Sequence, residues 1–193
     1  MALAADAIRH LTRAHIGARV YQGLLFCFVL LHNVRAVLFD LGYPNRRLHM
    51  WLSLGAIVSV ATLGTYCRWR FGWVEPQKDS LARQVLRGIA IAVLLVGTFI
   101  AIDLAATVAG TRPIDLAWLV VSAGTALRLS NSRGDRLGWV VPLLAAVALL
   151  ATLMVPALQP YRALGHGAMA AALLVTAVQL HLFLERGFRH AHV

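Results

Sequence analysis

The stretch VYQGLLFCFVLLHNVRAVLF, residues 20–39, decides the fold class of this chain. An apolar run of about 20 residues is long enough to cross the hydrocarbon core of a bilayer as a helix. The second half of the run nevertheless carries three polar side chains, His32, Asn33 and Arg35. Because ionisable groups at membrane depth are costly and often mark sites, these residues are the first candidates for function.

The composition of the whole chain points to the same class. The 193 residues are 60% hydrophobic and only 13% charged, with a mean hydropathy of +0.72. These values are typical of an integral membrane protein. The formal charge of +10 comes almost entirely from arginines, most of which flank apolar runs. This placement indicates membrane topology and argues against a nucleic-acid partner.

We predict an all-α membrane protein with a single domain, a bundle of six transmembrane helices. Residues 1–19 are expected to form a cytoplasmic, amphipathic lead-in to the first span. The predicted spans cover about residues 20–39, 50–67, 88–109, 115–130, 139–158 and 164–184. Cys27 and Cys67 lie in or beside these runs and form no C-x-x-C motif, so a disulfide framework and a zinc knuckle are not expected.

The fourth span is predicted to be short. Its uncharged run, Leu116 to Leu127, taken alone favours a re-entrant or buried segment. The arginines decide between the two topologies. If the segment spans, most basic residues lie on the side of the N-terminus; if it does not, they divide almost evenly. The positive-inside rule therefore favours six spans with both termini in the cytoplasm. The Ala- and Arg-rich usage suggests a bacterial inner membrane.

This topology gathers polar residues near the outer ends of the helices. The predicted outer cluster consists of His32, Asn33, Arg35, His49, Asp103 and His166. Arg35 and Asp103 lie at similar depth, and an ion pair between them would relieve the cost of two charges in the membrane. In the alternative, Arg35 snorkels to the headgroups and Asp103 is hydrogen-bonded to the backbone or to Thr107.

The histidines suggest ligation of a metal or of b-type haem, because haem in membrane bundles is held between histidines of facing helices. His32 and His166 form the predicted outer pair, and His15 and His181 an inner pair. The alternative for the inner pair is a role as interfacial anchors. No family resemblance supports either pair.

The sequence is compatible with three functions. The leading expectation is a non-catalytic subunit or accessory of a larger membrane complex, in contact with lipid and with other membrane subunits. The chain has no hydrolase, zinc-protease or nucleotide-binding motif, so we do not expect an enzyme on its own. Gly167 and Ala171, spaced as small-xxx-small, would let a helix approach closely. The alternatives are a haem- or metal-binding electron-transfer subunit using His32 and His166, and a small transporter or channel using Asp103 and Arg35.

Overall fold

The computed structural model describes residues 2–43, 46–72, 113–133 and 137–190, together with separate helical positions between 86 and 108. The described part of the chain is all-helical and contains no strand, which confirms the predicted all-α class. Its six α-helices are α1 (Ala2–Ala18), α2 (Leu24–Asp40), α3 (Arg46–Phe71), α5 (Pro113–Asn131), α6 (Val140–Met154) and α7 (Arg162–His190). A short 3-10 helix, η1 (Pro156–Tyr161), connects α6 to α7.

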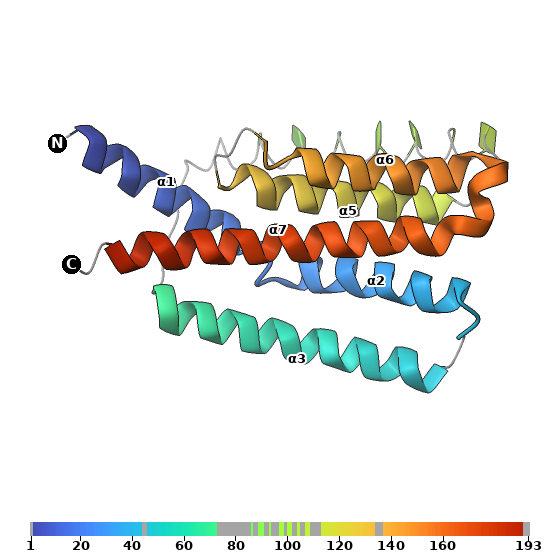
Figure 1. Ribbon diagram of the computed structural model, residues 1–193, viewed down its shortest axis with the longest axis horizontal. Helices are drawn as coiled ribbons and strands as arrows, with labels where there is room; N and C mark the ends of the chain where they lie inside the picture. The colour runs from blue at the N-terminus through green and yellow to red at the C-terminus, as the bar shows by residue number, and fades with distance from the viewer. Residues whose placement is uncertain are drawn as a thin grey trace.

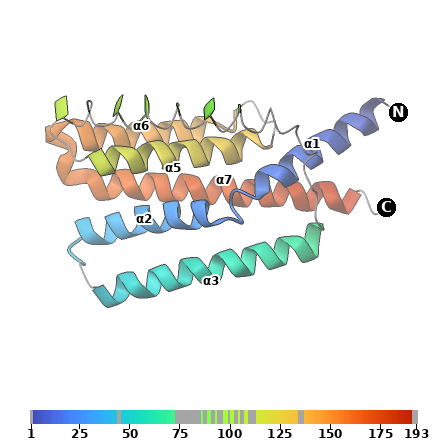
Figure 2. The same ribbon diagram turned by 180° about the vertical axis from the view of Figure 1, so that it is seen from behind.

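The helices lie side by side in an elongated bundle with α7 at its centre (Figure 1). Helix α7 contacts α1, α2, α5 and α6, whereas α3 packs mainly on α2. The view from behind shows the same order, with α2 between α3 and α7 (Figure 2). Both chain termini lie at the same end of the bundle (Figure 1). The end formed by the first turns of α5 and α7 is therefore the end remote from the termini.

The first apolar run, residues 20–39, is divided between a turn and a helix. Gly23 is extended, with φ −99° and ψ 167°, and α2 starts at the next residue. At the other end of α2, Gly42 has φ +85°, and the Tyr43 N–H donates to the Leu38 carbonyl at 2.9 Å. This is the hydrogen bond of a helix stop that favours glycine. The predicted span of residues 20–39 is thus a helix that begins four residues later.

Helix α6 is shorter than the span predicted for this region. It ends at Met154, because Val155 is extended, with φ −96° and ψ 115°, ahead of Pro156. The residue before a proline avoids the helical region, so the helix stops here and η1 returns the chain to α7. The predicted span of residues 139–158 therefore joins a helix and a connecting turn.

Two helices are long and apolar enough to cross a membrane. They cover Met50–Phe71, with a mean hydropathy of 1.5, and Pro156–Phe188, with a mean hydropathy of 1.8. Only 6% of the apolar window of the first is buried inside the chain, against 44% for the second. Helix α3 leaves large side chains such as Trp51, Ile57 and Val58 more than half exposed. An exposed apolar surface of this kind is typical of contact with lipid or with a partner. The other predicted spans stay predictions.

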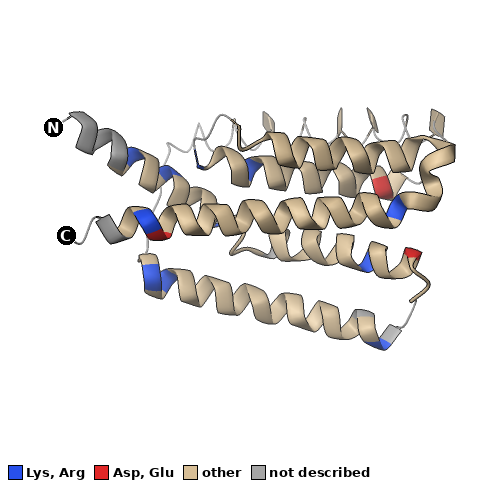
Figure 3. Cartoon of the chain, in the orientation of Figure 1, with Lys and Arg blue, Asp and Glu red and all other residues tan. Residues whose placement is uncertain are grey.

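Basic side chains are concentrated at the ends of the helices (Figure 3). At the end that carries the termini, Arg68 and Arg70 lie in the last turn of α3 and Arg128 in the last turn of α5. Arg70 also donates two hydrogen bonds to the Glu185 carboxylate, at 2.9 and 2.8 Å. This ion pair connects α3 to α7 at the same end of the bundle.

Candidate functional site

A cavity of about 580 Å³ opens at the end remote from the termini, between α2, α5 and α7. It collects ionisable and aromatic side chains that are separated in the sequence by up to 134 residues. We call it the outer cavity; its polar and aromatic lining includes His32, Arg35, Asp40, Asp115, Trp118, Arg162 and His166.

Helical spacing explains how these side chains meet. His32 and Arg35 are one turn apart on α2, and Asp115 and Trp118 are one turn apart on α5. Arg162 and His166 have the same relation on α7. Residues three or four apart share one face of a helix. Each of the three helices therefore presents one polar stripe to the same cavity.

The centre of the site is a hydrogen-bond network around Asn33, whose side chain is fully buried. Its amide nitrogen donates to the Val29 carbonyl at 2.9 Å and to the Ser122 hydroxyl at 3.0 Å. Its amide oxygen lies 3.0 Å from Nδ1 of His166. Asn33 thus joins α2 to α5 and α7 in the interior, and each polar atom of its amide has a partner.

This network determines the tautomer of His166. Because the amide nitrogen of Asn33 uses both hydrogens as a donor, its oxygen faces His166 as an acceptor. Nδ1 of His166 therefore carries the proton, and Nε2 has the free lone pair. A hydrogen bond that orients a histidine through its second nitrogen is a common feature of metal-ligating histidines.

The second histidine of the cavity is held by ring contacts. His32 stacks on Trp118 with ring centres 4.5 Å apart and planes at 11°. It meets His166 edge to face, with ring centres 6.0 Å apart and planes at 72°. Nε2 of His32 is buried and has no hydrogen-bond partner among the described residues. The predicted outer pair thus lies at one place in the structure.

The outer cluster predicted from the sequence is only partly within the described residues. His32, Asn33, Arg35 and His166 are brought together, three of them as cavity lining and Asn33 behind them. Asp103 lies outside the described residues, so its ion pair with Arg35 stays a prediction. The side chain of His49 also lies outside them, although its backbone belongs to α3.

Several residues of the site were not expected from the sequence. Asp115, Trp118 and Ser122 follow one another at helical spacing on α5, and Arg162 precedes His166 by one turn. The regular spacing from Asp115 to Ser122 is the signal that could have placed one polar face of α5 beside His32.

The inner histidines have a different environment. Nδ1 of His181 lies 3.3 Å from the Tyr21 hydroxyl, which also lies 3.2 Å from Sγ of Cys67. The His181 ring contacts Phe71 with ring centres 5.6 Å apart, and His15 contacts Phe71 at 6.5 Å. Both rings therefore belong to one aromatic cluster at the end that carries the termini. Ligation of a cofactor by the inner pair stays a prediction.

His15 makes the docking of α1 sensitive to pH. Burial, and to a smaller degree the nearby Arg19, lower the pKa of His15 below its ordinary value of 6.5. Below pH 6.5 the unfolded chain therefore binds more protons than the folded one, and stability falls as the pH falls. We expect α1 to exchange amide hydrogens faster at pH 5 than at pH 7.5, with at most about 1.4 kcal/mol lost per pH unit. An unchanged pH dependence in His15→Phe would contradict this assignment.

A close approach between α6 and α7 lies at Gly165, outside the predicted pair of small residues. A methyl group on Gly165 would lie 3.1 Å from Cα of Leu149 and 2.5 Å from the Thr152 hydroxyl. A methyl group on Gly167 would meet only Val37, at 3.9 Å, and Ala171 is exposed. Gly165 therefore lets α6 and α7 pack closely, and Ala171 lies on the outer surface of α7.

The described part of the chain is thus an all-helical protein with two helices long and apolar enough to cross a membrane and a pair of neighbouring histidines near one end. No family model matches the chain, and neither does any curated protein or solved structure. The site itself is therefore the basis for the proposed function.

Proposed function

We propose that the chain is a multi-pass protein of the bacterial inner membrane with both termini in the cytoplasm. The support comes from α3, whose apolar window is only 6% buried within the chain. The arginines in the last turns of α3 and α5 add to it, because they lie at the end that carries both termini. A cytoplasmic location of that end agrees with the positive-inside rule. The outer cavity then faces the opposite side of the membrane.

Within this membrane protein, we propose that the outer cavity binds b-type haem between His32 and His166. The observation that carries the proposal is the pair of imidazoles, one oriented by Asn33 and the other with an unpartnered, buried Nε2. The two ring centres lie 6.0 Å apart, so one bound metal would be within reach of both imidazoles.

The surroundings of the two histidines also fit this cofactor. A volume of about 580 Å³ is in the usual range for a cofactor cavity. Arg35 and Arg162 line the same cavity, and guanidinium groups pair well with the carboxylates that haem carries. Nε of Arg162 is buried and has no hydrogen-bond partner among the described residues, so it is a donor that a bound anion would satisfy.

When bound, haem would supply one-electron transfer. The protein would contribute the lone pairs of His32 and His166, and Asn33 would hold the His166 ring in the tautomer that ligation requires. Trp118 would fix the plane of His32 by stacking. These roles describe a small electron-transfer subunit, which needs partners that deliver and accept electrons.

A second feature supports the broader proposal of a subunit in a larger membrane complex. An apolar groove of about 440 Å³ lies between α2 and α3 and is lined in part by Gly55, Ala56 and Ser59. Transmembrane helices associate through small residues that let their backbones approach closely. A helix of another subunit would fit this groove whether or not haem is bound. The transport alternative depends on Asp103, which lies outside the described residues, so no observation favours it.

The haem proposal is tested by titrating haem into the purified protein and into single variants of each histidine. We expect the wild type to bind one haem, and His32→Leu and His166→Leu to lose this binding. His10→Leu is the matched control, because His10 is exposed on α1 and distant in sequence from the cavity. Equal binding by all four proteins would refute ligation by the outer pair.

The subunit proposal needs a separate measurement. We expect the chain extracted in mild detergent to migrate with a partner, and Gly55→Leu, which fills the groove beside α3, to release that partner. Gly64→Leu is the matched control on the same helix, because Gly64 does not line the groove. Migration of the wild type as a monomer without a co-purifying protein would contradict the proposal.

A further inference from the structure

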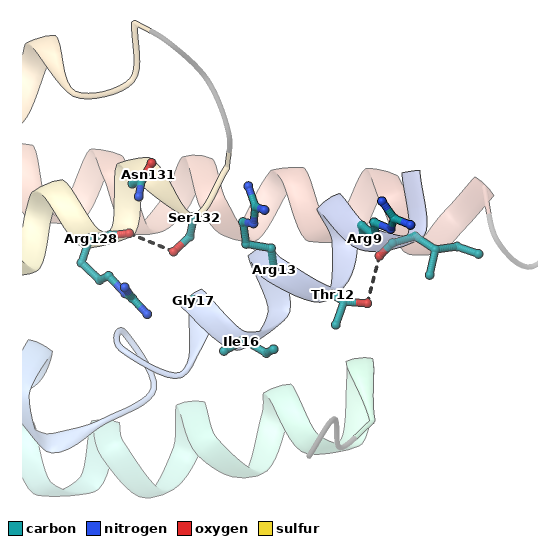
Figure 4. A pocket seen from close by; sticks show the side chains of 9 residues that line it. Arg9, Thr12, Arg13, Ile16, Gly17, Arg128, Asn131 and Ser132 are labelled. Carbon is teal, nitrogen blue, oxygen red and sulfur yellow. Dashed lines mark hydrogen bonds between the residues drawn. The ribbon is translucent and has the colours of Figure 1, made fainter. Parts of the chain in front are cut away.

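A second polar cavity, of about 630 Å³, lies at the end that carries the termini, between α1 and the last turn of α5 (Figure 4). We call it the basic cavity. Three arginines line it, Arg9 and Arg13 from α1 and Arg128 from α5. It is separate from the outer cavity and shares no residue with it.

The two helices come together at a glycine. Gly17 lies opposite Ser132, and a methyl group on Gly17 would overlap the Ser132 side chain. The absence of a side chain at Gly17 therefore lets α1 dock against the end of α5. Arg9 and Arg13 lie one turn apart on α1, so both reach the same side of this junction. Figure 4 shows Arg13 and Arg128 on either side of Gly17.

The chemistry of the lining is cationic and partly apolar. No carboxylate is among the described residues that line the basic cavity. The hydroxyls of Thr12 and Ser132 already donate to backbone carbonyls, at 2.9 and 2.8 Å. The guanidinium groups of Arg13 and Arg128 are therefore the main donors for a ligand, and guanidinium suits phosphate oxygens in particular. Ile8 and Ile16 line the same cavity, and Ile8 is 64% exposed.

We infer that the basic cavity binds the phosphate of an anionic phospholipid headgroup. Phosphate esters share the chemistry that three arginines recognise, and the adjacent isoleucines favour a ligand that also has acyl chains. Basic cavities between helices on the cytoplasmic side of a membrane are known binding places for such headgroups. The location at the membrane surface rests on the topology proposed above, whereas recognition of phosphate by the arginines does not.

The inference is tested in nanodiscs that contain phosphatidylglycerol in a zwitterionic background, with retained lipid measured by native mass spectrometry. We expect the double variant Arg13→Gln/Arg128→Gln to bind the anionic lipid about thirty-fold more weakly, which corresponds to about 2 kcal/mol. The control is the double variant Arg128→Gln/Arg186→Gln, which has the same net charge as the first variant but keeps Arg13. We expect it to lose roughly half as much binding free energy for the lipid. Arg186 is exposed near the end of α7 and does not line the cavity.

A second arm of the experiment separates lipid from soluble phosphate. Inorganic phosphate at millimolar concentration should not displace the lipid from the wild type. Binding of inorganic phosphate alone, with the same dependence on Arg13 and Arg128, would overturn the assignment to lipid. Equal lipid loss in both double variants would show a diffuse charge effect and would overturn the site. Haem binding at the outer cavity is expected to be the same in all these proteins, which separates this result from the haem proposal.

Discussion

Replacing Asn33 by leucine is expected to destabilise the protein by about 2–4 kcal/mol, because it removes one side chain that serves three partners. The change leaves the Nδ1 hydrogen of His166 and the Ser122 hydroxyl buried without their hydrogen bonds to Asn33. Each buried polar group that loses its partner costs about 1–3 kcal/mol. Equilibrium unfolding in mixed micelles measures the loss. Ser59→Ala is the control, since Ser59 is exposed and its hydroxyl donates to the Gly55 carbonyl of its own helix.

A double-mutant cycle shows whether the cost comes from the hydrogen bond to His166. Phenylalanine at position 166 keeps a ring but has no N–H that needs a partner. The loss in Asn33→Leu/His166→Phe should therefore be smaller than the sum of the losses in the two single variants. Additive losses would mean that the two side chains are not coupled. In the haem titration, Asn33→Leu is expected to weaken binding by about 10- to 100-fold through the orientation of His166.

Gly165→Ala is expected to cost about 1–3 kcal/mol, although alanine favours helix formation. The added methyl group would lie 2.5 Å from the Thr152 hydroxyl and 3.1 Å from Cα of Leu149, so α6 and α7 must separate to accept it. Gly167→Ala is the matched control on the same helix, because its methyl group would meet only Val37, at an ordinary contact distance of 3.9 Å. It should be neutral or slightly stabilising.

Thr152→Ala provides the rescue for this prediction. It removes the atom closest to the new methyl group, so the double variant Gly165→Ala/Thr152→Ala should regain most of the lost stability. Thermal unfolding in detergent compares the wild type, Gly165→Ala, Gly167→Ala, Thr152→Ala and the double variant. Similar stability of Gly165→Ala and Gly167→Ala would contradict the close packing of α6 on α7.

Much of the fold could be predicted from hydropathy and helix-breaking residues. The apolar runs gave the helical class, whereas the predicted span of residues 139–158 ran past Pro156, before which α6 ends. The sequence did not reveal the turn at Gly23, which separates α1 from α2, because this turn lies within the first apolar run. It also did not identify Gly165, where α6 and α7 pack closely; the approach of another helix at Gly167 and Ala171, within the chain or from a partner, stays a prediction. Spacing identifies small residues, but only packing shows which of them faces another helix.

Only part of the candidate site could be predicted from the sequence. The predicted topology brought His32 and His166 to the outer ends of their helices, and the structure places their ring centres 6.0 Å apart. Depth alone does not give the rotation of each helix about its axis. The hydrogen bond from Asn33 to Ser122 and the stacking of Trp118 on His32 both depend on that rotation. For this reason α5 contributed no residue to the predicted cluster.

The outer and basic cavities lie at opposite ends of the bundle, and α5 contributes residues to both. In the proposed topology, the proposed haem site faces the outer side and the proposed lipid site faces the cytoplasm. The two sites have different ligands and can be tested independently.

The most direct test of haem binding by the outer cavity is the visible absorption spectrum of the protein, purified from membranes of cells that make haem. We predict a Soret band and a reduced-minus-oxidised difference spectrum of a b-type haem, both absent from His32→Leu and His166→Leu. A purified wild type with no Soret absorbance and no bound transition metal would contradict haem binding by the outer cavity.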